Sequence, residues 1–527
     1  MKPDGGSLIG FGSGGAGASF QAFDPVRGVA LEPSFPSATP ADIERAVKLA
    51  AAAAPELARR TGAERNRFLR AIADNLEAKG ADLVDRAVQE TGLAAARLTG
   101  EIGRTAQQLR LYGAAAEAGD WLDARIETAR PERRPLPRPD HRSMRRPLGP
   151  VVVFGASNFP FAYSVAGGDT ASAFAAGCPV IVKAHPAHPG TGELVGRLIL
   201  HAVRDLGWPE GTFSLLFDAG FAVGQALVQH PLVRAVGFTG SLRGGRALAD
   251  LAAARPEPIP VYAEMGSINP VFLLPGALAE RAETLAEGLQ ASATASAGQF
   301  CTNPGLIVLP RTAAAERFVE ELLRRLASTP AAPMLTPGIR RQFEVATAER
   351  AALTGVRPLR PGGGVVAGGV TPRWFETDAA VFRGTPALAE EIFGPSSLVV
   401  WCRDAVEMRA VAEALPGSLT ASVHCSAGEA EAARGLLDLL AEKAGRLIVN
   451  GWPTGLEVSD AIVHAGPYPA TSDGGRSTSV GTRALERWGR LVCYQNTPDD
   501  LLPPELRNAN PLGLRRQVDG EWTGRGW

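Results

Sequence analysis

The chain has 527 residues, of which 45% are apolar and 21% charged, and its formal net charge is −1. This length exceeds what one compact core usually supports, so we expect two or three domains. The near-zero charge excludes bulk attraction to nucleic acid or to an anionic membrane, and no apolar run in the sequence could span a bilayer. Five scattered cysteines without CxxC spacing argue against disulfides and a zinc site, so we expect a reducing compartment and a cytoplasmic protein.

Residues 1–19 are rich in glycine, and we expect them to form a flexible arm. The run Gly10–Gly15 matches GxGxxG, but it lacks the preceding strand and following helix that a dinucleotide fingerprint requires. We therefore do not assign it to a cofactor. Farther along, Thr39 is placed to cap a helix that starts at Pro40, and amphipathic patterns continue to about Thr91. A helical region is predicted there.

The segment from Arg130 to Arg146 is rich in arginine and proline. It could be a nucleic-acid patch or an exposed, extended segment. Proline confines strands to sheet edges, and no aromatic residues alternate with the arginines to stack on bases. The extended segment is therefore the preferred interpretation, without a nucleic-acid partner.

From Gly149 onward, short apolar runs alternate with helical patterns, which indicates an α/β fold with a parallel sheet buried on both faces. A second alternation of the same kind runs from about Pro270 to Asn450. The strands of the first alternation are expected at Val151–Phe154, Pro179–Lys183, Thr212–Leu216 and Ala235–Phe238.

Three segments carry residue types suited to acyl transfer through a thioester. Cys301, between Phe300 and Thr302, is a candidate nucleophile; Glu264 is a candidate base; and Asn158, after the first strand, is a candidate oxyanion donor. The apolar neighbours of Glu264 predict a desolvated carboxyl with a raised pKa, which suits a general base.

In this order, and together with Glu391–Pro395, these segments resemble the aldehyde dehydrogenase superfamily over most of the chain. The resemblance implies a Rossmann-like cofactor domain, a second α/β catalytic domain and a small β oligomerisation element. It also implies NAD(P)-dependent oxidation of an aldehyde through a Cys301 thioester, with Glu264 activating water. A catalytically silent homologue, which would act as a structural or binding protein, and a CoA-acylating relative are the alternatives, but both commonly lack one of these residues.

The same resemblance implies the cofactor-binding residues, namely Lys183, Gly240, Ser241, Glu391 and Phe393. Gly240 and Ser241 follow a strand and open a helix, where backbone N–H groups can meet a pyrophosphate. Lys183 and Glu391 resemble the residues that bind the two riboses, and Phe393 packs nearby.

Two further features concern cofactor choice and metals. Many NAD-dependent relatives carry a glutamate where this chain has Pro186, and loss of that carboxylate permits a 2′-phosphate, so NADP is slightly favoured over NAD. His185 and His188 form an HxxH pair, but the neighbouring prolines disrupt the helix that a metal site would need, so no metal is predicted.

Several segments resemble bacterial α-ketoglutaric semialdehyde dehydrogenases, among them Ala166–Thr170, Gly466–Ser472 and Arg476–Gly481. They are also similar to an NADP-dependent fatty aldehyde dehydrogenase. The preferred substrate is 2,5-dioxopentanoate, which would be oxidised to 2-oxoglutarate, and Phe159 is expected to line the substrate tunnel in either case.

We expect a homodimer or homotetramer, because the family places a subunit-joining strand pair near the arginine-rich segment. The expected parts of the chain are a flexible arm (1–19), a cofactor domain (20–128 and 150–263), a catalytic domain (264–475), an oligomerisation element (129–149 and 485–505) and a C-terminal tail (506–527).

Overall fold

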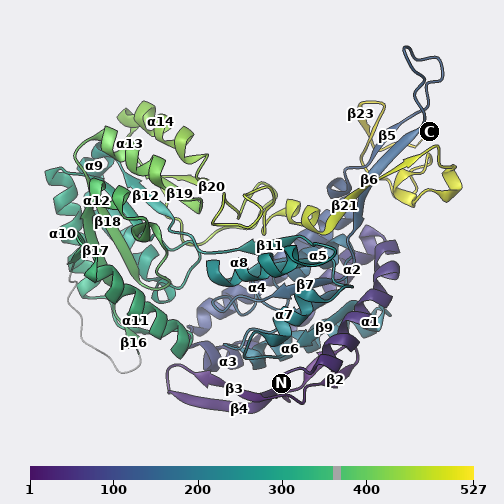
Figure 1. Cartoon of the computed structure of the whole chain (residues 1–527), viewed down its shortest axis with the longest axis horizontal. Helices are drawn as coiled ribbons and strands as arrows, with labels where there is room; N and C mark the ends of the chain where they lie inside the picture. Colours follow the sequence, from purple (N-terminus) through teal and green to yellow (C-terminus); the bar gives the residue numbers. More distant parts are fainter. Residues whose placement is uncertain (360–368, 527) are drawn as a thin grey trace.

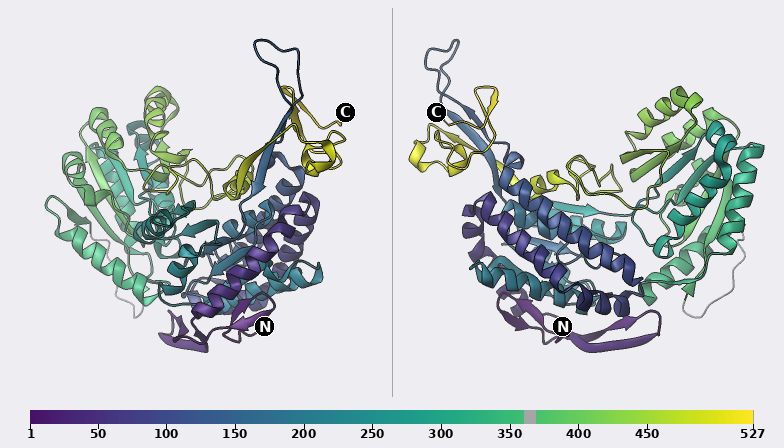
Figure 2. Two further views of the ribbon diagram at one scale, coloured as in Figure 1. Left: turned by 45° about the vertical axis from the view of Figure 1, so that its right-hand side comes forward. Right: turned by 180° about the vertical axis from the view of Figure 1, so that it is seen from behind.

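The computed structural model describes residues 1–359 and 369–526, which form three bodies in Figure 1. The purple-to-teal body holds the N-terminus, the green body follows it in the chain, and a β arm projects beside the C-terminus. Figure 2 shows a yellow segment, which follows the green body in the chain, running across to the arm. No helix in the described part of the chain is long and apolar enough to span a bilayer.

The first body is built on a parallel sheet whose strands are apolar because helices cover both faces. The parallel strands lie in the order β11-β10-β7-β8-β9, and Val151 pairs with Val180 and with Ala235. The bounds are β7 (Val151–Phe154), β8 (Val180–Lys183), β9 (Phe213–Leu216), β10 (Ala235–Thr239) and β11 (Val261–Glu264). The crossover helices are α5 (Gly168–Ala176), α6 (Pro189–Asp205), α7 (Ala222–Gln229) and α8 (Leu242–Ala253).

The N-terminal residues are not the loose arm that their composition suggested. β1 (Ser7–Ile9) pairs antiparallel with β9 through Leu8 and Leu215, and β2 (Gly12–Gly14) completes a hairpin. Ile9 is 1% exposed. The N-terminal segment is ordered because β9 would otherwise be an unpaired edge of the sheet, and the short strand β1 covers that edge. The hairpin turn contains Gly10 and Phe11, within the GxGxxG match.

Four helices that precede β7 in the chain pack on this body. The predicted cap holds, since the Thr39 hydroxyl accepts from the Asp42 N–H and the Asp42 carboxylate accepts from the Thr39 N–H. The fourth helix was not predicted, and it packs along the second helix. The bounds are α1 (Pro40–Arg59), α2 (Gly62–Ala78), α3 (Gly80–Thr91) and α4 (Ala95–Ala118), preceded by the hairpin β3 (Ser19–Asp24) and β4 (Val29–Pro36).

The second body is a seven-stranded sheet in the order β15-β17-β18-β13-β12-β19-β20, with only β15 antiparallel to its neighbour. β11 ends the first sheet at Glu264 and β12 begins the second at Pro270, so the two bodies meet in this short connection. The strands are β12 (Pro270–Leu273), β13 (Leu306–Pro310), β15 (Arg357–Leu359), β17 (Arg373–Asp378), β18 (Ser396–Cys402), β19 (Ser418–His424) and β20 (Ala444–Val449), beside the pair β14 (Ala332–Pro333) and β16 (Gly369–Val370). The helices are α9 (Pro275–Thr294), α10 (Ala313–Ala327), α11 (Pro337–Ala352), α12 (Ala379–Gly384), α13 (Ala405–Ala414) and α14 (Ala430–Leu440).

The arm is a five-stranded sheet in the order β21-β6-β5-β22-β23. The arginine-rich segment supplies β6, which pairs along its length with β21 far downstream. Residues 506–527 were expected as a separate tail, but they contribute β22 and β23 to this sheet because β5 offers an open edge. The bounds are β5 (Arg125–Glu127), β6 (His141–Pro147), β21 (Gly489–Gln495), β22 (Arg516–Val518) and β23 (Glu521–Thr523).

Candidate active site

Cys301 lies in a loop between a short 3₁₀ helix, Ala295–Gly298, and β13. Gly298 has a φ of +65° and lies against the Gly394 backbone so closely that a β-carbon would clash. The segment that carries Cys301 therefore packs directly on the Gly394–Pro395 turn, and the two sequence motifs meet without a side chain between them.

Asn269 supports the Cys301 loop through hydrogen bonds to its backbone, although the sequence offered no reason to single it out. Its amide nitrogen donates to the carbonyl of Cys301 at 2.8 Å and to that of Asn303 at 3.0 Å. Its amide oxygen accepts from the hydroxyls of Ser267 and Thr420. Because Asn269 is fully buried and every polar atom of its side chain is bonded, it positions the backbone around the thiol.

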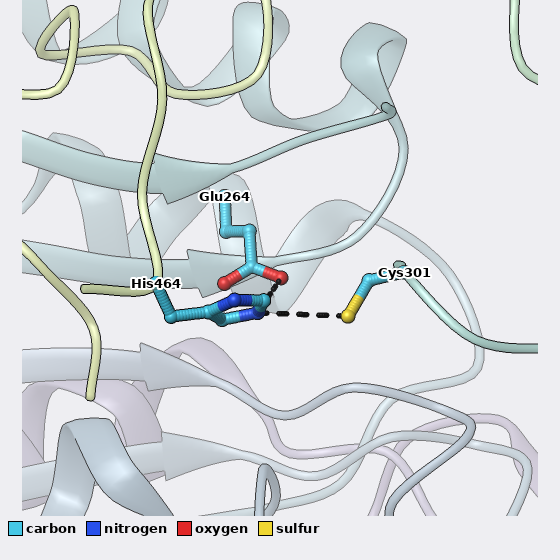
Figure 3. A group of neighbouring side chains, drawn as sticks. All are labelled: Glu264, Cys301 and His464. Atoms are coloured by element: carbon cyan, nitrogen blue, oxygen red, sulfur yellow. Dashed lines mark hydrogen bonds and ion pairs between the residues drawn. The ribbon is translucent and has the colours of Figure 1, made fainter. Parts of the chain in front are cut away.

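The Cys301 thiol, the Glu264 carboxylate and the His464 imidazole form one compact group (Figure 3). His464 Nε2 lies 3.6 Å from Cys301 Sγ and 3.1 Å from Glu264 Oε1. The other carboxylate oxygen accepts from the Ser479 hydroxyl at 3.1 Å. A protonated Nε2 can donate to the carboxylate or to a thiolate, so the ring lies where it can link the two groups.

The pKa of Glu264 differs from the expectation. Burial raises it, as its apolar neighbours predicted, but the electrostatic effect of His464 and hydrogen bonds from His464 and Ser479 outweigh burial. The net pKa lies below the ordinary value of a glutamate. The carboxyl group is therefore held as an ion because a partner from elsewhere in the chain supplies hydrogen bonds to its charged form.

The Cys301 thiol shows the opposite behaviour. Burial raises its pKa well above the ordinary value, and the nearby carboxylates of Glu264 and Glu391 raise it further. The resting residue is therefore a neutral thiol. Forming the nucleophilic thiolate requires a proton acceptor nearby, and the group contains two.

Asn158 follows β7 and approaches the Cys301 loop. Its amide nitrogen donates to the Gln299 carbonyl at 3.0 Å, and its own carbonyl accepts from Arg97 at 2.7 Å. An amide nitrogen has two hydrogens, so one remains for another acceptor near the thiol. Phe159 is 7% exposed, and its ring contacts the rings of Phe300 and Tyr163 at 5.3 and 5.2 Å.

The carboxyl ends of β7 and β10 form a topological switch, since the chain leaves them toward opposite sides of the sheet. Such a crevice suits a dinucleotide. Ser241 caps α8 there by accepting from the Gly244 N–H, and the Gly240 N–H donates to the Glu264 carbonyl. A β-carbon on Gly240 would clash with the Phe238 ring. The Phe238 ring therefore leaves no room for a side chain at Gly240, and the Gly240 N–H is already engaged by the Glu264 carbonyl.

The remaining cofactor-binding candidates are Lys183, on the strand next to β7, and the two residues Glu391 and Phe393. Lys183 ends β8 and donates to the Asp218 carbonyl at 2.6 Å, and burial lowers its pKa to about 8. Glu391 and Phe393 line a small cavity together with Ser267. Burial raises the pKa of Glu391 to about 8, despite a hydrogen bond from the Ser267 backbone.

His464 is the main residue that sequence reasoning missed. The one signal available was its position just before the quoted segment Gly466–Ser472. With Glu264 and Cys301 it could also reach one metal ion, which the sequence analysis had not anticipated. A nucleophilic thiol has to be free, so we assign no metal there. In the HxxH pair, His188 Nε2 bonds to the Ala156 carbonyl at 2.9 Å, and His185 Nδ1 accepts from the Ala187 N–H at 3.1 Å.

Comparisons with known proteins bear on the family and on the fold. A family model described as "Aldehyde dehydrogenase family" matches residues 13–466. The chain is 52% identical over 512 residues to alpha-ketoglutaric semialdehyde dehydrogenase 2 of Azospirillum brasilense, covering 96% of this chain and 97% of that protein. It is 45% identical over 491 residues to the alpha-ketoglutaric semialdehyde dehydrogenase of Acinetobacter baylyi, covering 93% of each.

A solved structure extends the comparison to the fold. Betaine aldehyde dehydrogenase from Staphylococcus aureus, in complex with NAD⁺, superposes with a TM-score of 0.79 at 18% identity. The match covers 94% of this chain and 98% of that one. The predicted fold class is confirmed.

Proposed function

We propose a substrate and a mechanism for this chain, which belongs to the aldehyde dehydrogenase family and oxidises an aldehyde with a nicotinamide cofactor. The proposed substrate is 2,5-dioxopentanoate, and the product is 2-oxoglutarate. The observation that carries this choice is the 52% identity, over 96% of the chain, with a relative named for that substrate.

In the proposed first half-reaction, Cys301 attacks the aldehyde carbon. The thiol gives its proton to the neighbouring His464–Glu264 pair, and the 3.6 Å separation of Sγ and Nε2 supports that transfer. The new S–C bond turns the carbonyl oxygen into an oxyanion, to which the Asn158 amide and the Cys301 N–H are proposed to donate. The nicotinamide cofactor, when bound, supplies the acceptor for the hydride that the substrate carbon loses, and a thioester remains on Cys301.

In the proposed second half-reaction, the His464–Glu264 pair has first released the thiol proton to solvent, and Glu264 then takes a proton from a water molecule as that water attacks the thioester. The C–S bond breaks, the carboxylic acid is released, and the Cys301 thiolate takes up a proton to restore the resting thiol. Hydrogen bonds from His464 and Ser479 keep the Glu264 carboxylate ionised and aligned, which supports its role as the base.

We further propose that NADP is used at least as well as NAD. Pro186 follows β8 in the loop where a carboxylate would repel the 2′-phosphate of NADP, and Lys183 ends the same strand. Lys183, Ser241, Glu391 and Phe393 are proposed to contact the cofactor, and Gly240 is proposed to line the same turn without its N–H, which donates to the Glu264 carbonyl. The Pro186→Glu variant should raise KM for NADP much more than KM for NAD, and equal changes would contradict this assignment.

A homodimer or homotetramer is also proposed, in a reducing compartment that suits the five free cysteines. β21 and β20 are edge strands of different sheets, and each exposes apolar side chains, with Leu491 at 62% and Val449 at 51% exposure. Light scattering during gel filtration gives the assembly size. Leu491→Glu should shift it toward the monomer if these edges join subunits.

The test of the substrate is the rate of NADPH or NADH formation by the purified enzyme with 2,5-dioxopentanoate and with decanal. A kcat/KM for the dioxo acid that exceeds that for decanal by at least a hundredfold is the expected result. A preference for decanal would replace the proposed substrate with a fatty aldehyde and leave the roles of Cys301 and Glu264 unaffected.

A further inference from the structure

Three arginines gather around the Cys301 site from two different bodies of the molecule. Arg97 and Arg104 belong to α4 in the first body, and Arg446 belongs to β20 in the second (Figure 1). Arg97 lies 4.0 Å from the Glu101 carboxylate. Neither Arg104 nor Arg446 forms an ion pair within residues 1–359 and 369–526. Two positive charges near the nucleophile therefore have no carboxylate within ion-pair distance in that part of the chain, although the charge of Glu101 acts on Arg104 from farther away.

Aromatic rings connect Arg104 to the thiol. Its guanidinium lies 5.4 Å from the centroid of the Tyr163 ring and donates to the Tyr163 hydroxyl at 3.0 Å. The Tyr163 ring lies 6.1 Å from the ring of His464, whose Nε2 is 3.6 Å from Cys301 Sγ. Arg104 is thus separated from the Cys301–His464 pair by one aromatic side chain, and its orientation is set before any ligand arrives.

Arg446 approaches from the opposite body. Its two terminal nitrogens donate to the carbonyls of Pro453 and Gly455, and its buried Nε has no partner within the described ranges. Burial lowers the pKa of Arg446, the ionised forms of Cys301 and Tyr163 would oppose this shift, and the like charge of Arg104 adds to it. The two guanidinium groups therefore repel each other beside the thiol, and an anion between them would relieve that repulsion.

Arg97 differs from the other two in its contacts. It donates to the Asn158 carbonyl at 2.7 Å and lies over the rings of Phe159 and Phe300, at 4.9 and 5.3 Å from their centroids. Because it already has a carboxylate neighbour and a backbone acceptor, it serves to hold Asn158 and the aromatic rings in place.

We propose that Arg104 and Arg446 bind the carboxylate of the aldehyde substrate and thereby select an anionic substrate over an apolar one. This inference rests on the proposed function, since 2,5-dioxopentanoate carries a carboxylate at the end opposite its aldehyde. Four C–C bonds separate the two ends, a reach of roughly 5 Å when extended. A guanidinium binds a carboxylate through paired, charge-assisted hydrogen bonds, and two of them fix the substrate at the end remote from the thiol.

An apolar substrate fits the same surroundings poorly. A fatty acyl chain would have to lie against charged guanidinium groups and would leave them without water or an anion, which is unfavourable. The absence of a directly paired carboxylate on Arg104 and Arg446, within the described ranges, is therefore the feature that separates the two substrate classes.

The test uses the full-length variants Arg104→Met and Arg446→Met, with 2,5-dioxopentanoate, 5-oxopentanoate and pentanal as substrates. The last two have five carbons and differ in the carboxylate. Each variant should raise KM for both acids by about 10- to 100-fold, while kcat/KM for pentanal changes by less than about threefold. Arg110→Met is the matched control, because Arg110 lies on the same helix and pairs with Asp74 and Glu77 at the surface.

Several outcomes would overturn the inference. Equal losses with the acids and with pentanal would show that the arginines only support the fold, and unchanged KM values for the acids would show that they do not touch the substrate. Arg104→Lys keeps the charge and should recover part of the affinity for the acids, which a misfolded variant would not. If the wild-type enzyme itself prefers decanal, the proposed function fails; if it prefers the dioxo acid while both methionine variants keep its KM, only this inference fails.

Discussion

Replacing His464 with phenylalanine tests how the ionised state of Glu264 is maintained. The variant keeps an aromatic ring but removes the hydrogen bond to Glu264 Oε1, which is 3.1 Å long and fully buried. Burial alone raises the pKa of this carboxyl, and the His464 interaction is the largest effect that opposes it. Without the ring nitrogen, the pKa of Glu264 should therefore rise.

The size of the effect follows from the kind of bond that is lost. A hydrogen bond to a charged group contributes about 1.5–3 kcal/mol, and each pKa unit corresponds to about 1.36 kcal/mol. Glu264 acts as a base only when ionised, so deacylation slows as the pH falls through its pKa. The acid limb of the kcat profile should move upward by roughly one to two pH units in the variant.

The assay is kcat as a function of pH, with a rapid-mixing measurement at each pH to show that deacylation limits turnover. His464→Gln retains a donor and should shift the acid limb less than His464→Phe. Ser479→Ala removes the weaker bond to Glu264 Oε2 and should also give a smaller shift. An acid limb that stays in place in His464→Phe, with deacylation rate-limiting, would refute the idea that His464 controls the ionisation of Glu264.

Three further variants test the other parts of the site. Cys301→Ala should abolish dehydrogenation and leave NADP binding, measured by calorimetry, close to wild type; remaining turnover would exclude the nucleophile. Glu264→Gln should give a burst of reduced cofactor followed by slow turnover, and an unchanged steady-state rate would remove its role as the base. Asn158→Ala should lower kcat by about 10²–10³ with little change in KM if its amide donates to the oxyanion; a change confined to KM would contradict that role.

The strands and the catalytic segments could be predicted from the sequence because their signals are local. Four of the five parallel strands of the first body are short, mostly apolar runs, such as Val151–Phe154, and burial on both faces favours that pattern. The fifth, β11, was not predicted. The motifs around Cys301 and Glu264 were likewise recognisable in chain order. The N-terminal strand was missed because its stability comes from pairing with β9, which lies far along the chain.

The immediate surroundings of the thiol were decided by the tertiary structure. His464 reaches Glu264 and Cys301 only after a long segment has crossed back between the two bodies, and Asn269 supports the loop through contacts that no spacing reveals. For this reason the pKa of Glu264 is shifted downward, whereas the sequence predicted an upward shift. Apolar neighbours in the sequence raise it, whereas a distant histidine lowers it by bonding to the ionised form.

The sequence by itself therefore determined the two α/β bodies and the family, and it singled out Cys301 as the candidate nucleophile, since each depends on patterns that short stretches of chain carry. The tertiary structure alone decided which charges face the nucleophile. Arg104 comes from a helix of one body and Arg446 from an edge strand of the other, and their proximity arises only when the two bodies are packed together. Electrostatic energy depends on distance in space, which separation along the chain does not encode.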